Sequence, residues 1–337
     1  MRAQGGGESE WREAWKAVDP KVRLVFIIAA IQSGKTSVGE LGLCHIIANH
    51  PGPTLWRDQT DDYAKDQAES RLHKLFEDCA RVRRLIPGDR HKKRNTTIHF
   101  RNGMTLWVLG AHNKTNLQRR SIRWLIGDET WRWPVGHMAE AEARVTAFGW
   151  LGKCVFMSQG GEENDDTHRK FETTDMREWM FQCPKCGTRQ PWSWDQIEWS
   201  KSARDEAGEW DYAEVRRTAA MRCASCNHYF DDSDRTRREL NATGRFVVQN
   251  PRAAKESAGF HWNALCTMSW GRACRAICGR RPSPGVATSP HRAIGADATG
   301  VDFECDRACL DQAWSSPRIL GKFHKTFLEF NQLSVSG

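Results

Sequence analysis

The feature that most constrains the fold is an apolar segment followed at once by a glycine–lysine–threonine turn. Residues 22 to 30 are almost uniformly apolar and rich in β-branched side chains, which predicts a strand buried on both faces. After Ser33-Gly34-Lys35-Thr36, apolar residues recur at helical spacing as far as Asn49. A buried strand, a glycine-containing turn and a helix form the setting in which backbone N–H groups bind phosphate.

This turn fits the pattern G-x-x-x-x-G-K-[ST], with Ala29 in place of the first glycine. Glycine allows close approach to a phosphate, the lysine reaches the β- and γ-phosphates, and the threonine hydroxyl binds Mg²⁺. The predicted ATP-binding residues are Gln32, Ser33, Gly34, Lys35 and Thr36. The alternative is an ordinary strand–turn–helix that carries this tripeptide by chance.

An acidic pair follows another apolar run, at Asp128-Glu129 after residues 122 to 126. We expect Asp128 to hold the Mg²⁺ shell and Glu129 to polarise the attacking water as general base. An isolated acidic pair at a strand end is usually a solvated turn. Downstream of a P-loop it becomes a Walker B candidate, and the two together predict an ATPase.

Two further residues are candidates for the same site. Ser158 follows the apolar run 154 to 157, where RecA-like motors place a polar residue that senses the γ-phosphate. Arg144 lies in a helix-patterned segment, and an arginine there can stabilise phosphate charge in cis or in trans. The alternatives are a plain strand-to-loop exit for the serine and a solvated position for the arginine.

The order of these segments predicts the fold class. Strands at 54–56, 122–126 and 154–157 alternate with helices at 36–49, 61–84 and 138–148, and a further short helix is expected at 11–18. Asn102-Gly103 lies between residues 96–100 and 104–109, which predicts a hairpin. We expect an α/β fold, a RecA-like P-loop NTPase with a mostly parallel sheet, followed by a small zinc-ribbon module.

Four of the twelve cysteines form two CxxC pairs, each followed by Gly or Asn: Cys183, Cys186, Cys223 and Cys226. Two thiolates three residues apart reach one metal from a tight turn, and the residue after them tolerates a left-handed backbone. Two such pairs predict a structural Cys₄ site for Zn²⁺, whereas a redox reading explains only one pair. Cys274, Cys278, Cys305 and Cys309 have a different spacing and are predicted to be thiols outside a metal site.

Charge and hydropathy limit the environment of the chain. Lys and Arg exceed Asp and Glu by 50 to 42, which is compatible with a polyanionic partner. No apolar run reaches the roughly 18 residues of a membrane span, and the N-terminus lacks the apolar core of a signal peptide. We expect a cytoplasmic protein without a membrane partner.

Changes in composition predict the boundaries of the modules. We expect an N-terminal tail at 1–20, the P-loop ATPase domain at 21–180, the zinc ribbon at 181–232, a post-ribbon segment at 233–265 and an irregular tail at 266–337. The tail has no period of either kind between 271 and 300.

Taken in order, these motifs resemble the ATPase half of the phage-type terminase large subunit of the GpA (lambda-like) family. The resemblance spans about residues 20 to 265 and rests on these segments: Gln32–Thr36, Arg71–Leu72, Asn95–Gly103, Leu109–Ala111, Leu117, Ile122–Arg123, Asp128–Pro134, Trp179–Trp199 and Gly259–Leu265. It implies a motor that translocates double-stranded DNA and works as a homo-oligomeric ring in the host cell cytoplasm. It also implies a small terminase subunit and a portal protein as partners.

The chain departs from the family pattern in two places. The family has Ser-Thr-Pro after the fourth strand, where this chain has Ser158-Gln159-Gly160. The family also continues into a nuclease domain with a carboxylate cluster, and we expect a truncated or frameshifted product without endonuclease activity. The alternatives are a zinc-containing helicase-like or remodelling ATPase, and a prophage remnant that binds nucleotide or DNA without turnover.

Overall fold

The computed structural model describes residues 19, 21–30, 33–89, 91–117, 120–160, 164–204 and 210–278. The helix predicted at 11–18, Gln32, Cys305, Cys309 and the tail beyond residue 278 lie outside this part of the chain. Among the described helices, none combines the length and the apolar character needed to cross a bilayer.

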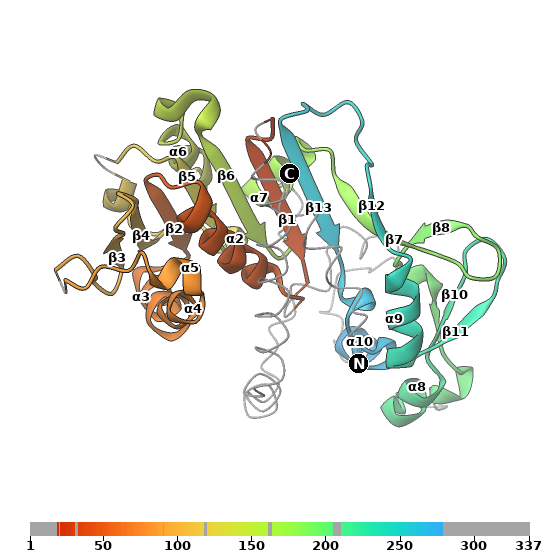
Figure 1. Ribbon diagram of the computed structural model, residues 1–337. Helices are drawn as coiled ribbons and strands as arrows, with labels where there is room; N and C mark the ends of the chain where they lie inside the picture. The colour runs from red at the N-terminus through yellow and green to blue at the C-terminus, as the bar shows by residue number, and fades with distance from the viewer. Residues whose placement is uncertain are drawn as a thin grey trace.

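A large, mostly parallel sheet runs through the described residues (Figure 1). Its strands are β1 Leu24–Ala29, β2 Thr54–Asp58, β3 Thr97–His99, β4 Thr105–Gly110, β5 Trp124–Gly127, β6 Lys153–Ser158, β7 Arg177–Gln182, β8 Arg189–Pro191, β12 Arg245–Val247 and β13 Ser257–Trp262. They lie in the order β12-β7-β13-β1-β6-β5-β2-β4-β3, and β8 pairs with β7. All neighbours from β7 to β4 are parallel, which confirms the predicted α/β fold.

Helices cover both faces of this sheet. The described helices are α2 Lys35–Asn49, α3 Asp61–Asp66, α4 His73–Asp78, α5 Ala80–Arg83, α6 His137–Ala143, α7 Asp166–Glu172, α8 Tyr212–Thr218, α9 Asp234–Ala242 and α10 Trp270–Cys278. Val25 and Ile27 of β1 pack with α2 to α5 on one face, and Leu24 and Phe26 pack with α6 and α7 on the other. The central strand is apolar throughout because both of its faces are buried.

The hairpin prediction is confirmed, since β3 pairs antiparallel with β4 around Gly103, whose φ is +83°. Two helix predictions were wrong in their extent. The segment at 61–84 is interrupted by a π-helical turn at Gln67–Leu72 and by an extended residue, Cys79. The segment at 138–148 ends as a helix at Ala143 and continues into a 3₁₀ turn.

The π-helical turn carries a buried polar contact with α2. Gln67 lies inside the core, where its Nε2 donates a hydrogen bond of 2.7 Å to Glu40 Oε1 of α2. Arg71 on the same turn pairs with that carboxylate, its Nε 2.7 Å from Oε1. The spacing of apolar residues does not predict this turn, because a buried polar residue such as Gln67 looks like a surface position in the sequence.

The cysteine-bearing segment contains a second sheet in the order β11-β10-β9, formed by β9 Ile197–Glu198, β10 Ala220–Arg222 and β11 Tyr229–Asp231. The chain enters this region after β7 and β8 of the main sheet and returns to the main sheet at β12 (Figure 1). The apolar core is continuous across both parts, since Phe181, Met221 and Phe230 belong to the cluster that contains Val25. The predicted module boundaries stay a prediction.

The strand β13 lies directly beside β1 along its whole length. Leu24 is in register with Ser257 and Ala29 with Trp262. This strand comes from the predicted post-ribbon segment, so the sheet that carries the P-loop is completed by residues far downstream.

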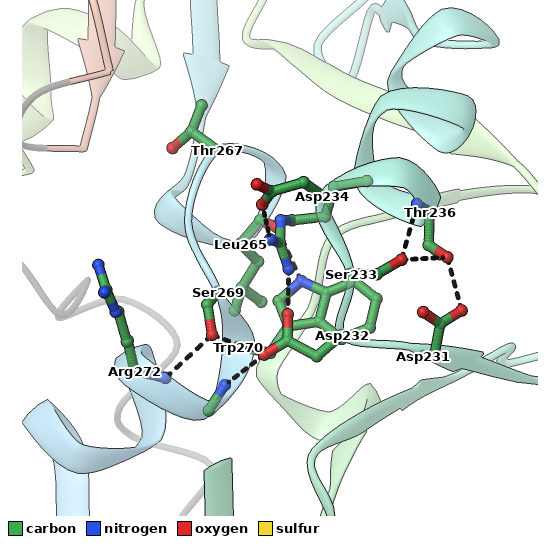
Figure 2. A network of polar contacts seen from close by, with 12 residues as sticks. Asp231, Asp232, Ser233, Asp234, Thr236, Leu265, Thr267, Ser269, Trp270 and Arg272 are labelled. Carbon is green, nitrogen blue, oxygen red and sulfur yellow. Dashed lines mark hydrogen bonds and ion pairs between the residues drawn. The ribbon is translucent and has the colours of Figure 1, made fainter. Parts of the chain in front are cut away.

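A buried polar network holds α10 in place (Figure 2). Asp232 accepts hydrogen bonds from Ser269 Oγ at 2.7 Å and from Gly271 N at 3.0 Å, at the first turn of the helix. Arg237 pairs with Asp232, and both side chains are only 7% exposed. Trp270 donates its indole N–H to the carbonyl of Leu265 at 2.9 Å. The helix was not predicted, because the sequence analysis placed these nine residues in an irregular tail at 266–337; the structure shows that this part of the tail is helical.

Candidate functional site

The candidate site lies where four neighbouring parallel strands end. The predicted P-loop follows β1, Ser158 ends β6, Asp128 follows β5 and Asp58 ends β2. These strands are adjacent in the order β1-β6-β5-β2, and the arrowheads of β1, β6 and β13 point to one edge of the sheet in Figure 1. Parallel strands that end together bring residues distant in sequence to a common edge, where open α/β sheets bind ligands.

The turn after β1 is shaped by Gly34, whose φ is +92°. This left-handed backbone suits glycine, and a side chain there would be strained. Ser33 Oγ donates a hydrogen bond of 2.6 Å to the carbonyl of Ala30, which closes the turn before α2 begins at Lys35. Gly34 has no side chain to cap α2. The first N–H groups of the helix are therefore available to bind an anion.

Lys35 and Glu129 form an ion pair across the site, with Nζ 3.0 Å from Oε1. The lysine side chain is 6% exposed and the glutamate side chain 23%. Glu129 has a φ of +50°, a left-handed conformation that costs a non-glycine residue of the order of 1 kcal/mol. The end of β5 thus holds the carboxylate against Lys35 at the expense of backbone strain.

Asp128 is buried beside this pair. Its Oδ1 accepts a hydrogen bond of 3.0 Å from the backbone N–H of Glu129, and the side chain of Thr36 also bonds to it. Burial and the charge of Glu129 raise the pKa of Asp128 to about 7, against the opposite effect of Lys35. A nearby cation strongly stabilises the ionised form of a buried carboxylate whose pKa is raised in this way.

Asp58 is a third carboxylate at this edge, and the sequence analysis missed it. It is 7% exposed, and its Oδ1 accepts the backbone N–H of Gln59 at 2.7 Å. Because Arg57 is in register with Gly127, Asp58 lies next to Asp128 across the sheet. Burial raises the pKa of Asp58 to about 6, and the charge of Glu129 adds to the effect.

The remaining predicted residues fall in different places. Ser158 is fully buried at the same edge, where its Oγ accepts the backbone N–H of Trp131 at 3.1 Å. Arg144 is not brought to the cluster: its carbonyl accepts the N–H of Ile122, which precedes β5 at the opposite end from Asp128. The geometry therefore gives no support to a role for Arg144 in cis, and a role in trans stays a prediction. Gln32 lies outside the described residues.

The four predicted cysteine ligands gather in one place. Their Sγ atoms all lie within 4.8 Å of one another, and Cys183–Cys226 and Cys186–Cys223 are each 3.8 Å apart. Gly187 and Asn227 have φ values of +74° and +56°, the left-handed backbone expected after each pair. The group can hold a metal ion. Among the described residues it is the one group of three or more His, Cys, Asp and Glu side chains whose ligand atoms lie this close together.

The surroundings of these thiols shift their pKa values in opposite directions. Hydrogen bonds from Thr188 lower the pKa of Cys186 to about 6. The His228 backbone N–H lowers the pKa of Cys226, but burial and the neighbouring thiols outweigh it and raise that pKa to about 11. Cys226 N–H also points to Cys223 Sγ at 3.5 Å. Backbone N–H groups directed at sulfur stabilise thiolates, the form in which cysteine binds metal.

Comparison with known proteins gives one extensive match. The profile of the family described as "Phage terminase large subunit gpA, ATPase domain" matches residues 12–246. No curated protein matches the chain.

Solved structures show weaker likenesses. The ATPase domain of the Thermus phage P74-26 large terminase is 18% identical over 66% of this chain and 88% of that chain, with a TM-score of 0.37. The HK97 bacteriophage large terminase is 13% identical over 48% of this chain and 35% of that chain, with a TM-score of 0.39. A large terminase from a thermophilic bacteriophage is 18% identical over 45% of this chain, with a TM-score of 0.34, and the chain spans 37% of its length.

Proposed function

Because the chain belongs to the family of phage terminase large subunit gpA ATPase domains, we propose that it is the ATP-hydrolysing part of a motor that packages double-stranded DNA. The observation that carries this proposal is the contact of Lys35 with Glu129, beside Thr36 and Asp128, at the carboxyl edge of a parallel sheet. A cation, a hydroxyl and two carboxylates are the groups that phosphoryl transfer to water requires.

ATP would bind with its phosphates against the first turn of α2. The N–H groups after Gly34 would bind phosphate oxygens, and Lys35 would bind the β- and γ-phosphates. Those oxygens compete with Glu129 for the same ammonium group. Binding of ATP therefore releases one carboxylate oxygen of Glu129, which becomes available to take a proton from the attacking water.

Mg²⁺ fits the donors next to this position. The hydroxyl of Thr36 and the carboxylate of Asp128 would hold it, and hard oxygen ligands of this kind suit the ion. The raised pKa of Asp128 supports the assignment, because a bound cation offsets the cost of burying that charge. When bound, the ion would neutralise part of the phosphate charge.

Zn²⁺ fits the Cys₄ group. All four positions of a tetrahedral site come from the protein, which supports a structural role for the ion. It would join the turn after β7 to the turn after β10, and so fasten the small sheet to the strand that leaves the main one.

The assembly around the ATPase is part of the same proposal. Double-stranded DNA, a small terminase subunit and a portal protein would be its partners in the host cytoplasm, and the net charge of +8 is compatible with DNA. In a homo-oligomeric ring, Arg144 could act on the site of a neighbouring copy, since it lies away from the site of its own chain.

The test is ATP hydrolysis by the purified chain with and without double-stranded DNA. Hydrolysis that DNA stimulates, without strand separation, supports the packaging motor. Strand separation would favour a helicase-like enzyme, and nucleotide binding without any turnover would favour a remnant.

A further inference from the structure

We propose that Trp131 is a positioning residue for ATP hydrolysis: its indole N–H orients the carboxylate of Glu129, and its backbone N–H links this arrangement to Ser158. The inference rests on the proposed function, because it concerns the same site. Neither the P-loop motif nor the acidic pair predicts a role for this tryptophan.

The first observation is how the two oxygens of Glu129 are held. Oε1 lies 3.0 Å from Lys35 Nζ, and Oε2 accepts the indole N–H of Trp131 at 2.7 Å. Gln159 Nε2 is a weaker second donor to Oε2 at 3.4 Å. A contact of 2.7 Å between an N–H donor and a carboxylate is short, as expected when the acceptor is charged.

ATP would compete for only one of these contacts. Its phosphates attract Lys35, whereas the indole group carries no charge and is attracted much less by phosphate. Once Lys35 has turned to the nucleotide, Trp131 is the shortest described contact that still orients Glu129. The tryptophan therefore keeps the carboxylate in place during the step in which the orientation of the base affects the rate.

Indole is chemically suited to this task. A lysine or arginine at this position would neutralise the carboxylate and weaken it as a base, but a neutral N–H orients it and leaves its charge in place. The indole N–H also does not ionise over the pH range in which enzymes work. The orientation of Glu129 is then independent of the protonation of its partner.

Trp131 is itself fixed on three sides. Its backbone N–H donates to Ser158 Oγ at 3.1 Å, its indole N–H reaches Glu129, and the guanidinium of Arg132 lies 4.5 Å from the ring centroid. Ser158 ends β6, the strand between β1 and β5. A movement at the end of β6 would thus reach the general base through one residue.

The test compares Trp131→Phe with Trp150→Phe. Trp131→Phe keeps an aromatic ring beside Arg132 and removes the indole N–H together with the pyrrole part of the ring. Trp150→Phe makes the same change at a tryptophan that is 68% exposed and lies before β6, at the opposite end of that strand from Ser158. We expect kcat of Trp131→Phe to fall by about tenfold to a hundredfold, with KM and ADP affinity within about twofold of wild type.

Wild-type kcat in Trp131→Phe would overturn the inference while leaving the ATPase proposal intact. An inactive wild type would instead contradict the ATPase proposal. The contact also has a readout that does not depend on activity. The indole ¹H–¹⁵N NMR signal of Trp131 is the one that disappears in Trp131→Phe. This signal should shift in Glu129→Gln and stay in place in Glu77→Gln. A signal unmoved by Glu129→Gln would also overturn the inference.

Discussion

The ammonium group of Lys35 lies 3.0 Å from the carboxylate of Glu129, so the predicted phosphate-binding cation and the predicted general base form one ion pair. In the proposed mechanism this pair makes ATP binding and hydrolysis interdependent. A change at either residue should alter both the affinity for ATP and the chemical step, but in different proportions.

Glu129→Gln should lower kcat by about 10² to 10⁴ and leave ATP affinity equal or higher. The base is lost, and Lys35 no longer has a carboxylate that competes with the phosphates. Steady-state ATPase rates and nucleotide titration measure the two effects. Glu77→Gln, a change in an exposed ion pair, is the control. Turnover near the wild-type rate would exclude Glu129 as the base.

Lys35→Ala should weaken ATP binding by at least about tenfold, because a charge-assisted contact with phosphate is lost. The carboxylate of Glu129 is then left without its cation in a partly buried site, which increases the electrostatic cost of bringing in ATP. Titration with a fluorescent ATP analogue tests this, with the exposed Lys65→Ala as the matched variant. Equal affinity in the two variants would contradict the P-loop assignment.

Asp58→Asn should change how stability depends on pH. The folded-state pKa of Asp58 is raised by burial to about 6, so the folded protein holds this proton more strongly than the unfolded chain. In the wild type this group therefore lowers the free energy of unfolding as pH rises from about 4 through about 6.

In Asp58→Asn the free energy of unfolding no longer falls with pH on account of this group. The difference in free energy of unfolding between the variant and the wild type should therefore increase between pH 4 and pH 8 by up to about 3 kcal/mol in favour of the variant. Denaturant unfolding at both pH values provides the measurement, and Asp62→Asn, at an exposed position, is the control. A difference between variant and wild type that is independent of pH would argue against the buried, protonated carboxyl.

Cys186→Ser should abolish stoichiometric zinc and lower the thermal stability of the protein. Three thiolates and a hydroxyl form a much poorer site, and structural zinc contributes directly to folding. Metal analysis after dialysis against a weak chelator provides the measurement. Ser225→Ala, an exposed change in the second cysteine turn, should keep its zinc. A wild-type protein without zinc would contradict the assignment.

Asp232→Ala should destabilise the protein by about 3 kcal/mol, since it leaves Arg237 buried without its main partner and uncaps α10. Glu239→Gln breaks an exposed pair with Arg235 and should cost less than about 0.5 kcal/mol. Chemical denaturation of the two variants compares a buried pair with an exposed one. Similar small effects would show that the network in Figure 2 contributes little.

Much of the site could be predicted because its signals are local. A buried strand that runs into Gly34-Lys35-Thr36 needs no distant partner to be recognised, and the cysteine turns carry their own left-handed residues, Gly187 and Asn227. Asn102-Gly103 specifies its hairpin in the same way. In each case the local backbone conformation restricts which residues are allowed.

Features that depend on tertiary contacts could not be predicted in this way. Asp58 ends a strand whose apolar part stops at Trp56, so in sequence it looks like the start of a solvated turn. Only the pairing of β2 with β5 places it beside Asp128. The same holds for Trp131, whose indole N–H donates to the carboxylate of Glu129, a residue with a left-handed backbone.

The position of β13 has a consequence for protein synthesis. Among the described strands, β13 leaves the ribosome last, yet it covers one side of β1. Until residue 262 has emerged, the strand that leads into the P-loop has an unpaired edge, and exposed edges invite pairing with other chains. A recombinant fragment that ends at residue 246, where the family match ends, would keep that edge permanently open.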